Sequence, residues 1–200
     1  MSRILVVGED ALCCALGEKL VAAALPDWRF AAPSIDAKGI TKLVPNLPRY
    51  AEQAAHVQPV LCIADTDGRC ALDLMAAWRP ENARQHFILR LAVAEAESWV
   101  LADRPGFAEA FQVTMNKLPA ILDDEPDPKR LLLTLMAKSR KRIFRDEIVS
   151  QTDRNKQGAG YNVHLGKFVR SSWNIRRACD HSPSLNRALR SLQSLDANKR

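Results

Sequence analysis

Short apolar runs alternate with amphipathic segments along the first half of the chain. Predicted strands lie at 3–8, 27–33, 59–65 and 86–93, and predicted helices at 11–25 and 70–78. Residues 40–56 have helical spacing that Pro45 and Pro48 interrupt, so we expect a loop followed by a helix there. Strands that alternate with helices predict an α/β fold, with a mainly parallel sheet flanked by helices.

From about residue 97 onward the pattern is helical. Helices are predicted at 97–111 with a break at Pro105-Gly106, at 127–148 and at 182–195, and a polar loop at 152–164. Asp127 and Ser182 each precede a proline, the arrangement of an N-cap followed by proline at the first helical position. We therefore expect an α/β core at 1–104, with a helical, basic C-terminal region at 105–200 packed on it.

The composition is that of a globular protein. The 200 residues are 47% hydrophobic and 26% charged. No apolar stretch approaches the length of a membrane span, and the run at 3–7 lacks the features of a signal peptide. The five cysteines include no CxxC pair, so reduced structural thiols are expected. These features predict a soluble, cytoplasmic protein that does not enter membranes.

The net charge of +6 is divided unevenly along the chain. Residues 1–128 carry 12 Lys/Arg and 18 Asp/Glu, a balance of −6, whereas residues 129–200 carry 17 and 5, a balance of +12. An acidic body with a basic C-terminal third fits a polyanion-binding surface beside a cation site. A solvated basic helical tail is the alternative, and charge alone does not separate the two.

Acidic residues follow three of the predicted strands. They are Glu9 and Asp10, Asp65 and Asp67, and Glu95 and Glu97. Ligands of parallel sheets bind at the carboxyl ends of the strands. In extended backbone, Asp65 and Asp67 point the same way and offer two oxygens to a hard cation such as Mg²⁺.

Each acidic cluster also has a purely structural interpretation. Asp-Thr-Asp-Gly favours a turn, in which Gly68 allows the chain to reverse sharply. Glu9 and Asp10 precede a helix, whose N-terminal end attracts acids. Glu95 and Glu97 share a face if their segment is extended and diverge if it is helical. Nucleotide-binding glycine motifs, nucleophile elbows and histidine ligand spacings are absent from the sequence.

Several segments resemble a known group of proteins. They read VAEAESWVLAD at 93–103, DPKR at 127–130, GYNVHLGKFV at 160–169 and CDHSPSLNRALRSL at 179–192. Together with the order of acidic clusters, they resemble a family of small Toprim-like proteins of unknown function, related to the Toprim domains of OLD nucleases, primases and topoisomerases. The resemblance covers nearly the whole chain. Glu97-Ser98-Trp99 and the Ser182–Leu185 segment are its most specific parts.

The resemblance implies a Toprim-like, Rossmannoid fold and a Mg²⁺-dependent enzyme of nucleic acids, with some relatives linked to phage defence beside an ATPase. Asp65 and Asp67 match the Toprim aspartate pair, and Glu97 matches a later glutamate. Toprim proteins usually place their first glutamate immediately before the glycine, where this chain has Val7. Glu9 is expected to take its place, as a metal ligand or as the base that activates water.

The leading hypothesis is phosphodiester hydrolysis with Mg²⁺ or Mn²⁺ held by Asp65, Asp67, Glu97 and Glu9. The residues expected to bind nucleic acid, either DNA or RNA, are Lys138, Arg140, Lys141, Arg142, Lys156, Tyr161, Lys167 and Arg170. A catalytically degenerate module that binds a partner protein, such as an ATPase, or nucleic acid without cleaving it is the alternative. A third hypothesis is phosphoryl transfer or hydrolysis on a small nucleotide.

Overall fold

The computed structural model describes residues 2–197, and the side chains of residues 2–195. Its centre is a parallel sheet of five strands in the order β2-β1-β4-β5, with β3 also paired to β1. The strands are β1 (Arg3–Gly8), β2 (Arg29–Phe30), β3 (Ile35–Asp36), β4 (Val60–Asp65) and β5 (Phe87–Ala92). The α/β fold with a mainly parallel, helix-flanked sheet is confirmed.

The strand predicted at 27–33 is confirmed only in part. β2 pairs with the beginning of β1, at Arg3 and Ile4, and β3 pairs with its end, at Val7 and Gly8. One edge of the sheet is therefore made of two short strands with residues 31–34 between them. Pro33 lies in this interruption, where its missing N–H removes a ladder hydrogen bond.

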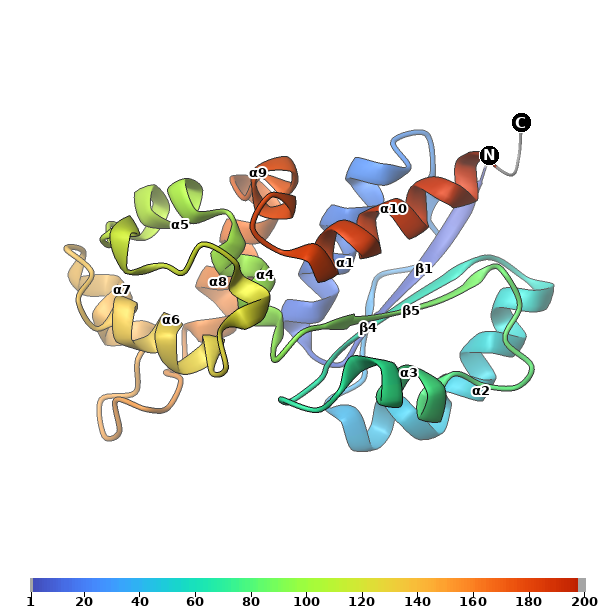
Figure 1. Cartoon of the computed structure of the whole chain (residues 1–200), viewed down its shortest axis with the longest axis horizontal. Helices are drawn as coiled ribbons and strands as arrows, with labels where there is room; N and C mark the ends of the chain where they lie inside the picture. The colour runs from blue at the N-terminus through green and yellow to red at the C-terminus, as the bar shows by residue number, and fades with distance from the viewer. Residues whose placement is uncertain (1, 198–200) are drawn as a thin grey trace.

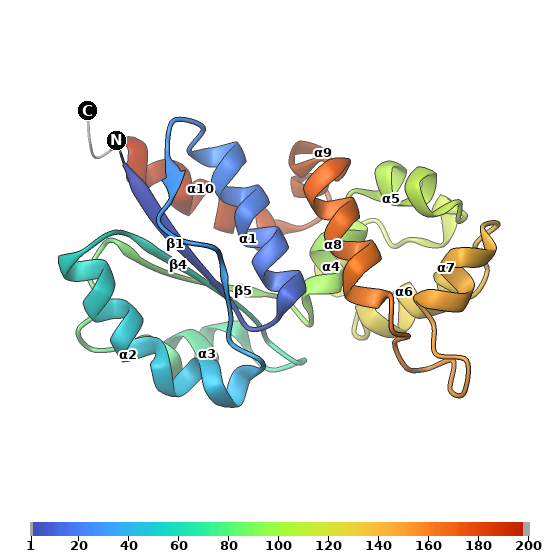
Figure 2. The ribbon, with the colours of Figure 1, turned by 180° about the vertical axis from the view of Figure 1, so that it is seen from behind.

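Helices cover both faces of the sheet (Figures 1 and 2). The helices are α1 (Ala11–Ala24), α2 (Ile40–His56), α3 (Ala71–Trp78), α4 (Ala96–Ala102), α5 (Arg104–Phe111), α6 (Pro128–Met136), α7 (Arg142–Glu147), α8 (Tyr161–Ser171), α9 (Ile175–Cys179) and α10 (Pro183–Ala197), with 3₁₀ turns η1 (Met115–Lys117) and η2 (Leu122–Asp124). Alternate residues of β1 enter two separate cores: Ile4 and Val6 face α1 and α10, whereas Leu5 and Val7 face α2.

The interruption expected within 40–56 is wrong, because α2 is one continuous helix. Its buried stripe is Leu43, Leu47, Ala51 and Ala54, which packs on the sheet. Pro45 and Pro48 both lie on the exposed face. The burial of the apolar stripe outweighs the two hydrogen bonds that these prolines remove from a solvated part of the helix.

The C-terminal half departs from the predicted boundaries in three places. The break expected at Pro105-Gly106 lies at Asp103, which caps α5 by accepting a hydrogen bond from the Gly106 N–H at 3.3 Å. The segment 127–148 is divided into α6 and α7, and the helices α8 and α9 had no counterpart in the sequence pattern. The Asp127 and Ser182 caps are confirmed, since their side chains accept from Arg130 N–H at 2.9 Å and Leu185 N–H at 3.3 Å.

Helices α4 to α9 form a lobe beyond the carboxyl ends of β1, β4 and β5 (Figure 1). The same hydrophobic cluster contains Ile4 and Leu16 of the N-terminal half and Phe107, Trp173 and Leu185 of the C-terminal half. The lobe is thereby joined to the sheet by continuous packing. Among the described helices, none combines the length and apolar character that crossing a membrane requires.

Candidate functional site

The acidic residues after β1 and β4 meet at the carboxyl edge of the sheet. Glu9 follows β1, and its carboxylate accepts a hydrogen bond from the Asp65 N–H at 3.1 Å. Asp10 caps α1 by accepting from the Cys13 N–H at 2.8 Å, and the Cys13 thiol donates to Asp65 Oδ1 at 3.8 Å. Val7 is buried within β1, so Glu9 is the glutamate that this strand brings to the edge.

The turn after β4 separates the two aspartates. Asp67 and Gly68 both have left-handed backbone, with φ of 48° and 73°. Asp67 is exposed and lies 3.7 Å from Arg69, whereas Asp65 points into the site. The expected sharp turn at Gly68 is confirmed. The extended backbone that would align both carboxylates is absent at Asp67.

Glu95 and Glu97 diverge because their segment is helical. Glu95 accepts a hydrogen bond from the Lys129 N–H at 2.9 Å, at the first turn of α6. Glu97 is buried, with 4% of its surface exposed, and accepts from the Tyr161 hydroxyl at 2.5 Å. The Lys129 ammonium lies 3.8 Å from the same carboxylate and over the Tyr161 ring at 5.6 Å. The site therefore includes Lys129, which the sequence pattern did not assign.

Repulsion and burial perturb the carboxylates of this site. The pKa of Asp65 is raised well above its usual range, first by burial and then by Glu97, Glu9, Asp10 and Asp67. Burial also raises the pKa of Glu9, with Asp67 and Asp10 adding to the effect and the Asp65 N–H opposing it. Carboxylates that are close together and partly buried repel each other, so a bound cation or a bound proton stabilises such a site.

Around Glu97 the repulsion is partly relieved within the protein. Burial raises its pKa, while the Lys129 charge and the Tyr161 hydroxyl act in the opposite direction. The pKa of Tyr161 is raised well above its usual range by burial and by Glu97. Tyr161 therefore remains a hydrogen-bond donor that holds the Glu97 carboxylate in place.

The donor chemistry of the site suits a hard cation. The Glu9 carboxylate lies against the Asp65 backbone N–H, and the two carboxylates repel each other. Mg²⁺ commonly binds through one or two carboxylates while it keeps several waters. Among residues 2–195, no three His, Cys, Asp or Glu side chains are grouped closely enough to hold a metal ion as they stand. The residues thus fit a cation held by the Glu9–Asp65 pair with water completing the coordination.

The expected nucleic-acid contacts fall into three groups. Lys138, Arg140, Lys141 and Arg142 are all exposed at the turn between α6 and α7. Lys167 and Arg170 are exposed on α8, where Arg170 binds Glu18 at 2.7 Å, and Lys156 is exposed in the loop before it. The prediction that Tyr161 binds nucleic acid is wrong, because only 2% of its surface is exposed and its ring is not available to stack on bases.

The two most specific segments of the resemblance meet in the structure. The Trp99 indole donates to Ser184 Oγ at 2.7 Å. Asp123 in turn accepts from Ser182 Oγ at 2.6 Å and from the Ser184 N–H at 2.7 Å. This network joins α4, η2 and α10. It fixes the helix that carries Glu97, and Trp173, which donates to the Trp99 carbonyl at 3.2 Å, adds a second support.

Comparisons of this chain with protein-family models, with curated proteins and with solved structures found no match.

Proposed function

We propose that this protein is a divalent-cation-dependent enzyme that cleaves phosphodiester bonds of nucleic acid. The observation that carries the proposal is Asp65. Its carboxylate lies partly buried at the carboxyl edge of a parallel sheet, where open α/β sheets bind ligands. Its pKa is raised first by burial and then by the four neighbouring carboxylates of Glu97, Glu9, Asp10 and Asp67.

The roles follow from the contacts of each side chain. Asp65 and Glu9 would hold Mg²⁺ or Mn²⁺, and Asp67, exposed in the turn after β4, would add a ligand through water. When bound, the cation supplies charge stabilisation to the phosphate and to the leaving oxygen. Glu97, whose carboxylate accepts a hydrogen bond from Tyr161, would accept a proton from water. Lys129 would contact a phosphate oxygen, because 40% of its side chain stays exposed beside Glu97.

Substrate binding requires a surface away from the acidic edge. The exposed basic turn at Lys138–Arg142, between α6 and α7, supplies cationic groups on the helical lobe. A partner ATPase and a role in phage defence are part of the same proposal and rest on the resemblance to Toprim-like proteins alone.

Isothermal titration calorimetry with Mn²⁺ and Mg²⁺ tests the metal site. The native protein should bind Mn²⁺, and Asp65→Asn/Asp67→Asn should weaken binding by about 10–100-fold. Asp73→Asn/Glu81→Gln is the matched control, because it also removes two negative charges, both from exposed positions, and should leave the affinity unchanged. Binding by the native protein followed by cleavage of a single- or double-stranded substrate would support the enzyme. Absence of binding would refute it.

The triple variant Arg140→Ala/Lys141→Ala/Arg142→Ala tests the basic turn. Its affinity for a DNA or RNA oligonucleotide should fall by about tenfold or more, and the salt dependence should become less steep because fewer counterions are released. Lys42→Ala/Arg49→Ala removes exposed charges from α2 and serves as the control. Fluorescence anisotropy from about 50 to 200 mM salt measures both quantities. Unchanged affinity and slope in the triple variant would exclude this surface.

One observation favours a second candidate, a binding module without catalysis. Lys129 and Tyr161 already contact Glu97, so part of the charge that a cation would neutralise is neutralised by the protein. A module of this kind would retain oligonucleotide binding that depends on Arg140–Arg142. It would show neither Mn²⁺ binding nor loss of function in the Asp65 variants.

A further inference from the structure

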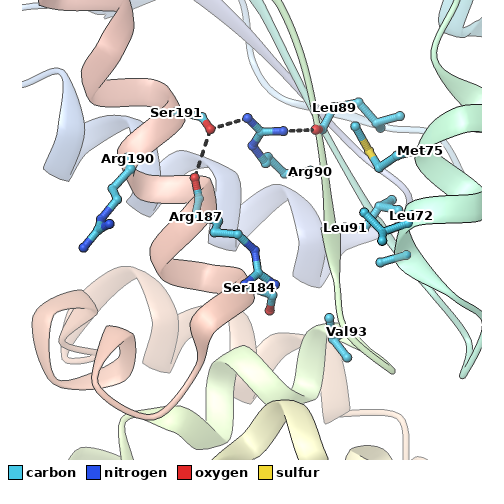
Figure 3. A pocket seen from close by; sticks show the side chains of 11 residues that line it. Leu72, Met75, Leu89, Arg90, Leu91, Val93, Ser184, Arg187, Arg190 and Ser191 are labelled. Carbon is cyan, nitrogen blue, oxygen red and sulfur yellow. Dashed lines mark hydrogen bonds between the residues drawn. The ribbon is translucent and has the colours of Figure 1, made fainter.

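A groove of about 720 Å³ lies along β5, between α3 and α10. Figure 3 shows α10 on one side of the strand and α3 on the other. Leu72 and Met75 of α3, with Leu89 and Leu91 of β5, form the apolar wall. Leu72 is 80% exposed, although it stands beside buried leucines of the sheet. Arg90, Arg187 and Arg190 form the opposite wall.

The floor of the groove is the free edge of the sheet. β5 pairs only with β4 in the described sheet, so its other edge has no neighbouring strand. The His86 carbonyl accepts a hydrogen bond from the first residue of β4, and the Ala92 carbonyl accepts one from the residue that follows β4. Because alternate residues of a strand point their backbone groups to the same side, the even-numbered residues of β5 point theirs toward β4. Leu89 and Leu91 therefore point theirs into the groove. Of these groups, the Leu89 carbonyl already accepts from Arg90 Nη1 at 2.8 Å.

The polar wall carries positive charge that the groove does not balance. No acidic residue is among the described residues that line it. Arg90 donates to Ser191 and to the Leu89 carbonyl, but its Nε is buried without a partner in the described part of the chain. Arg187 and Arg190 are both exposed on α10. The three guanidinium groups thus lie beside the free edge of β5, and they can donate further hydrogen bonds to a ligand there.

We propose that this groove binds an extended, acidic segment of a partner protein, which adds as a strand to the free edge of β5. Successive side chains of a strand point to opposite faces. Apolar side chains of the segment would pack on Leu72 and Met75, and the carboxylates between them would meet Arg90, Arg187 and Arg190. Main-chain hydrogen bonds supply affinity in such strand addition, and the alternating walls supply specificity.

Charge and shape select this occupant over two others. A second copy of the chain paired through β5 would place Arg90 and Arg187 of one copy against those of the other, which is repulsive. Nucleic acid would satisfy the arginines but would leave the leucine wall without an apolar partner. The inference stands independently of the proposed enzymatic function, because the groove shares none of the residues Glu9, Asp65 and Glu97.

The test uses a fluorescein-labelled heptapeptide of alternating leucine and glutamate, with anisotropy as the readout. The full-length protein should bind it about tenfold or more tightly than the peptide with lysine in place of glutamate. Arg187→Glu/Arg190→Glu should reverse that preference, and Leu72→Asp should weaken both peptides. All three positions are exposed, so the fold is retained. Lys42→Glu/Arg49→Glu, with the same charge change on α2, should leave binding unchanged.

A second peptide tests strand addition itself. Methylation of the backbone nitrogens of alternate residues keeps every side chain but removes half of the N–H groups. Two such peptides exist, one for each register of methylation, and the one that loses the N–H groups facing β5 should fail to bind. The proposal would be overturned by equal binding of the glutamate and lysine peptides, by binding that survives N-methylation in both registers, or by no binding at about 1 mM. An oligonucleotide that needs Arg187 and Arg190 while the peptide fails to bind would assign the arginines to nucleic acid instead.

Discussion

Replacing Asp65 with asparagine should lower the proposed phosphodiester cleavage by about 10²–10³-fold, the usual effect of removing one electrostatic stabiliser from an active site. The same substitution should make the metal-free protein more stable at pH 8. Asparagine removes the negative charge that Glu97, Glu9, Asp10 and Asp67 repel. We expect a rise in melting temperature of about 2 °C or more, which corresponds to ~1 kcal/mol in a chain of this size.

The pH dependence of this gain follows from the raised pKa of Asp65. A carboxyl group with a pKa above its unfolded value binds its proton more tightly in the folded state. Its contribution to stability is complete below the unfolded pKa of about 4 and is lost as the pH rises through the folded pKa. The difference in melting temperature between Asp65→Asn and the native protein should therefore be largest at pH 8 and disappear near pH 4.

Thermal denaturation in EDTA across this pH range measures the effect, with Asp73→Asn as the control. Addition of Mg²⁺ should then raise the melting temperature of the native protein and leave that of Asp65→Asn nearly unchanged, since a ligand stabilises only the state that binds it. If Asp65→Asn were less stable than the native protein at pH 8, the carboxylate would be a structural group and its role in catalysis would be wrong.

Asp103→Ala should be the most destabilising of the substitutions considered, by about 3 kcal/mol or more. The Asp103 side chain is completely buried and accepts four hydrogen bonds. Two come from the Arg177 guanidinium, at 2.7 and 2.9 Å, and two from the Gly106 and Asn174 N–H groups. Alanine would leave both backbone donors unpaired and would separate the starts of α5 and α9.

Urea denaturation followed by circular dichroism measures this loss, which should also appear as a fall of about 6–12 °C in melting temperature. Arg177→Ala should cost less, because both backbone hydrogen bonds to Asp103 remain. Asp146→Ala is the control: its exposed ion pair with Arg142, four residues away, should contribute less than about 0.5 kcal/mol. Similar losses in Asp103→Ala and Asp146→Ala would contradict the importance of the buried network.

The parts of the fold that follow from the sequence are those with strong local signals. β1, β4 and β5 are continuous apolar runs, which is typical of strands buried on both faces of a parallel sheet. The ends of these runs predicted that Glu9 and Asp65 lie at one edge of the sheet, and in the structure they do. The caps at Asp127 and Ser182 were equally clear, because side-chain capping depends only on neighbouring residues.

The parts that did not follow depend on partners distant in the sequence. Proline opposes a helix locally, but α2 is held by its packing on the sheet, which no local pattern reveals. Tyr161 lies beside glycines in a polar stretch, and only its contact with Glu97 shows that it belongs to the acidic site. Lys129 is one of many basic residues in the chain. Its position above Tyr161 distinguishes it, and that position exists only in the folded protein.

The long separation between the parts of the acidic site has a consequence for protein synthesis. Glu97 and the Tyr161 that holds it are 64 residues apart, and the serines that fix the helix of Glu97 come still later, at 182 and 184. A ribosome adds roughly 5–20 residues per second, so the strand-end acids leave the exit tunnel several seconds before their supports. The growing chain thus carries an incomplete acidic site until the segments that bear Tyr161, Ser182 and Ser184 have also been synthesised and have left the tunnel.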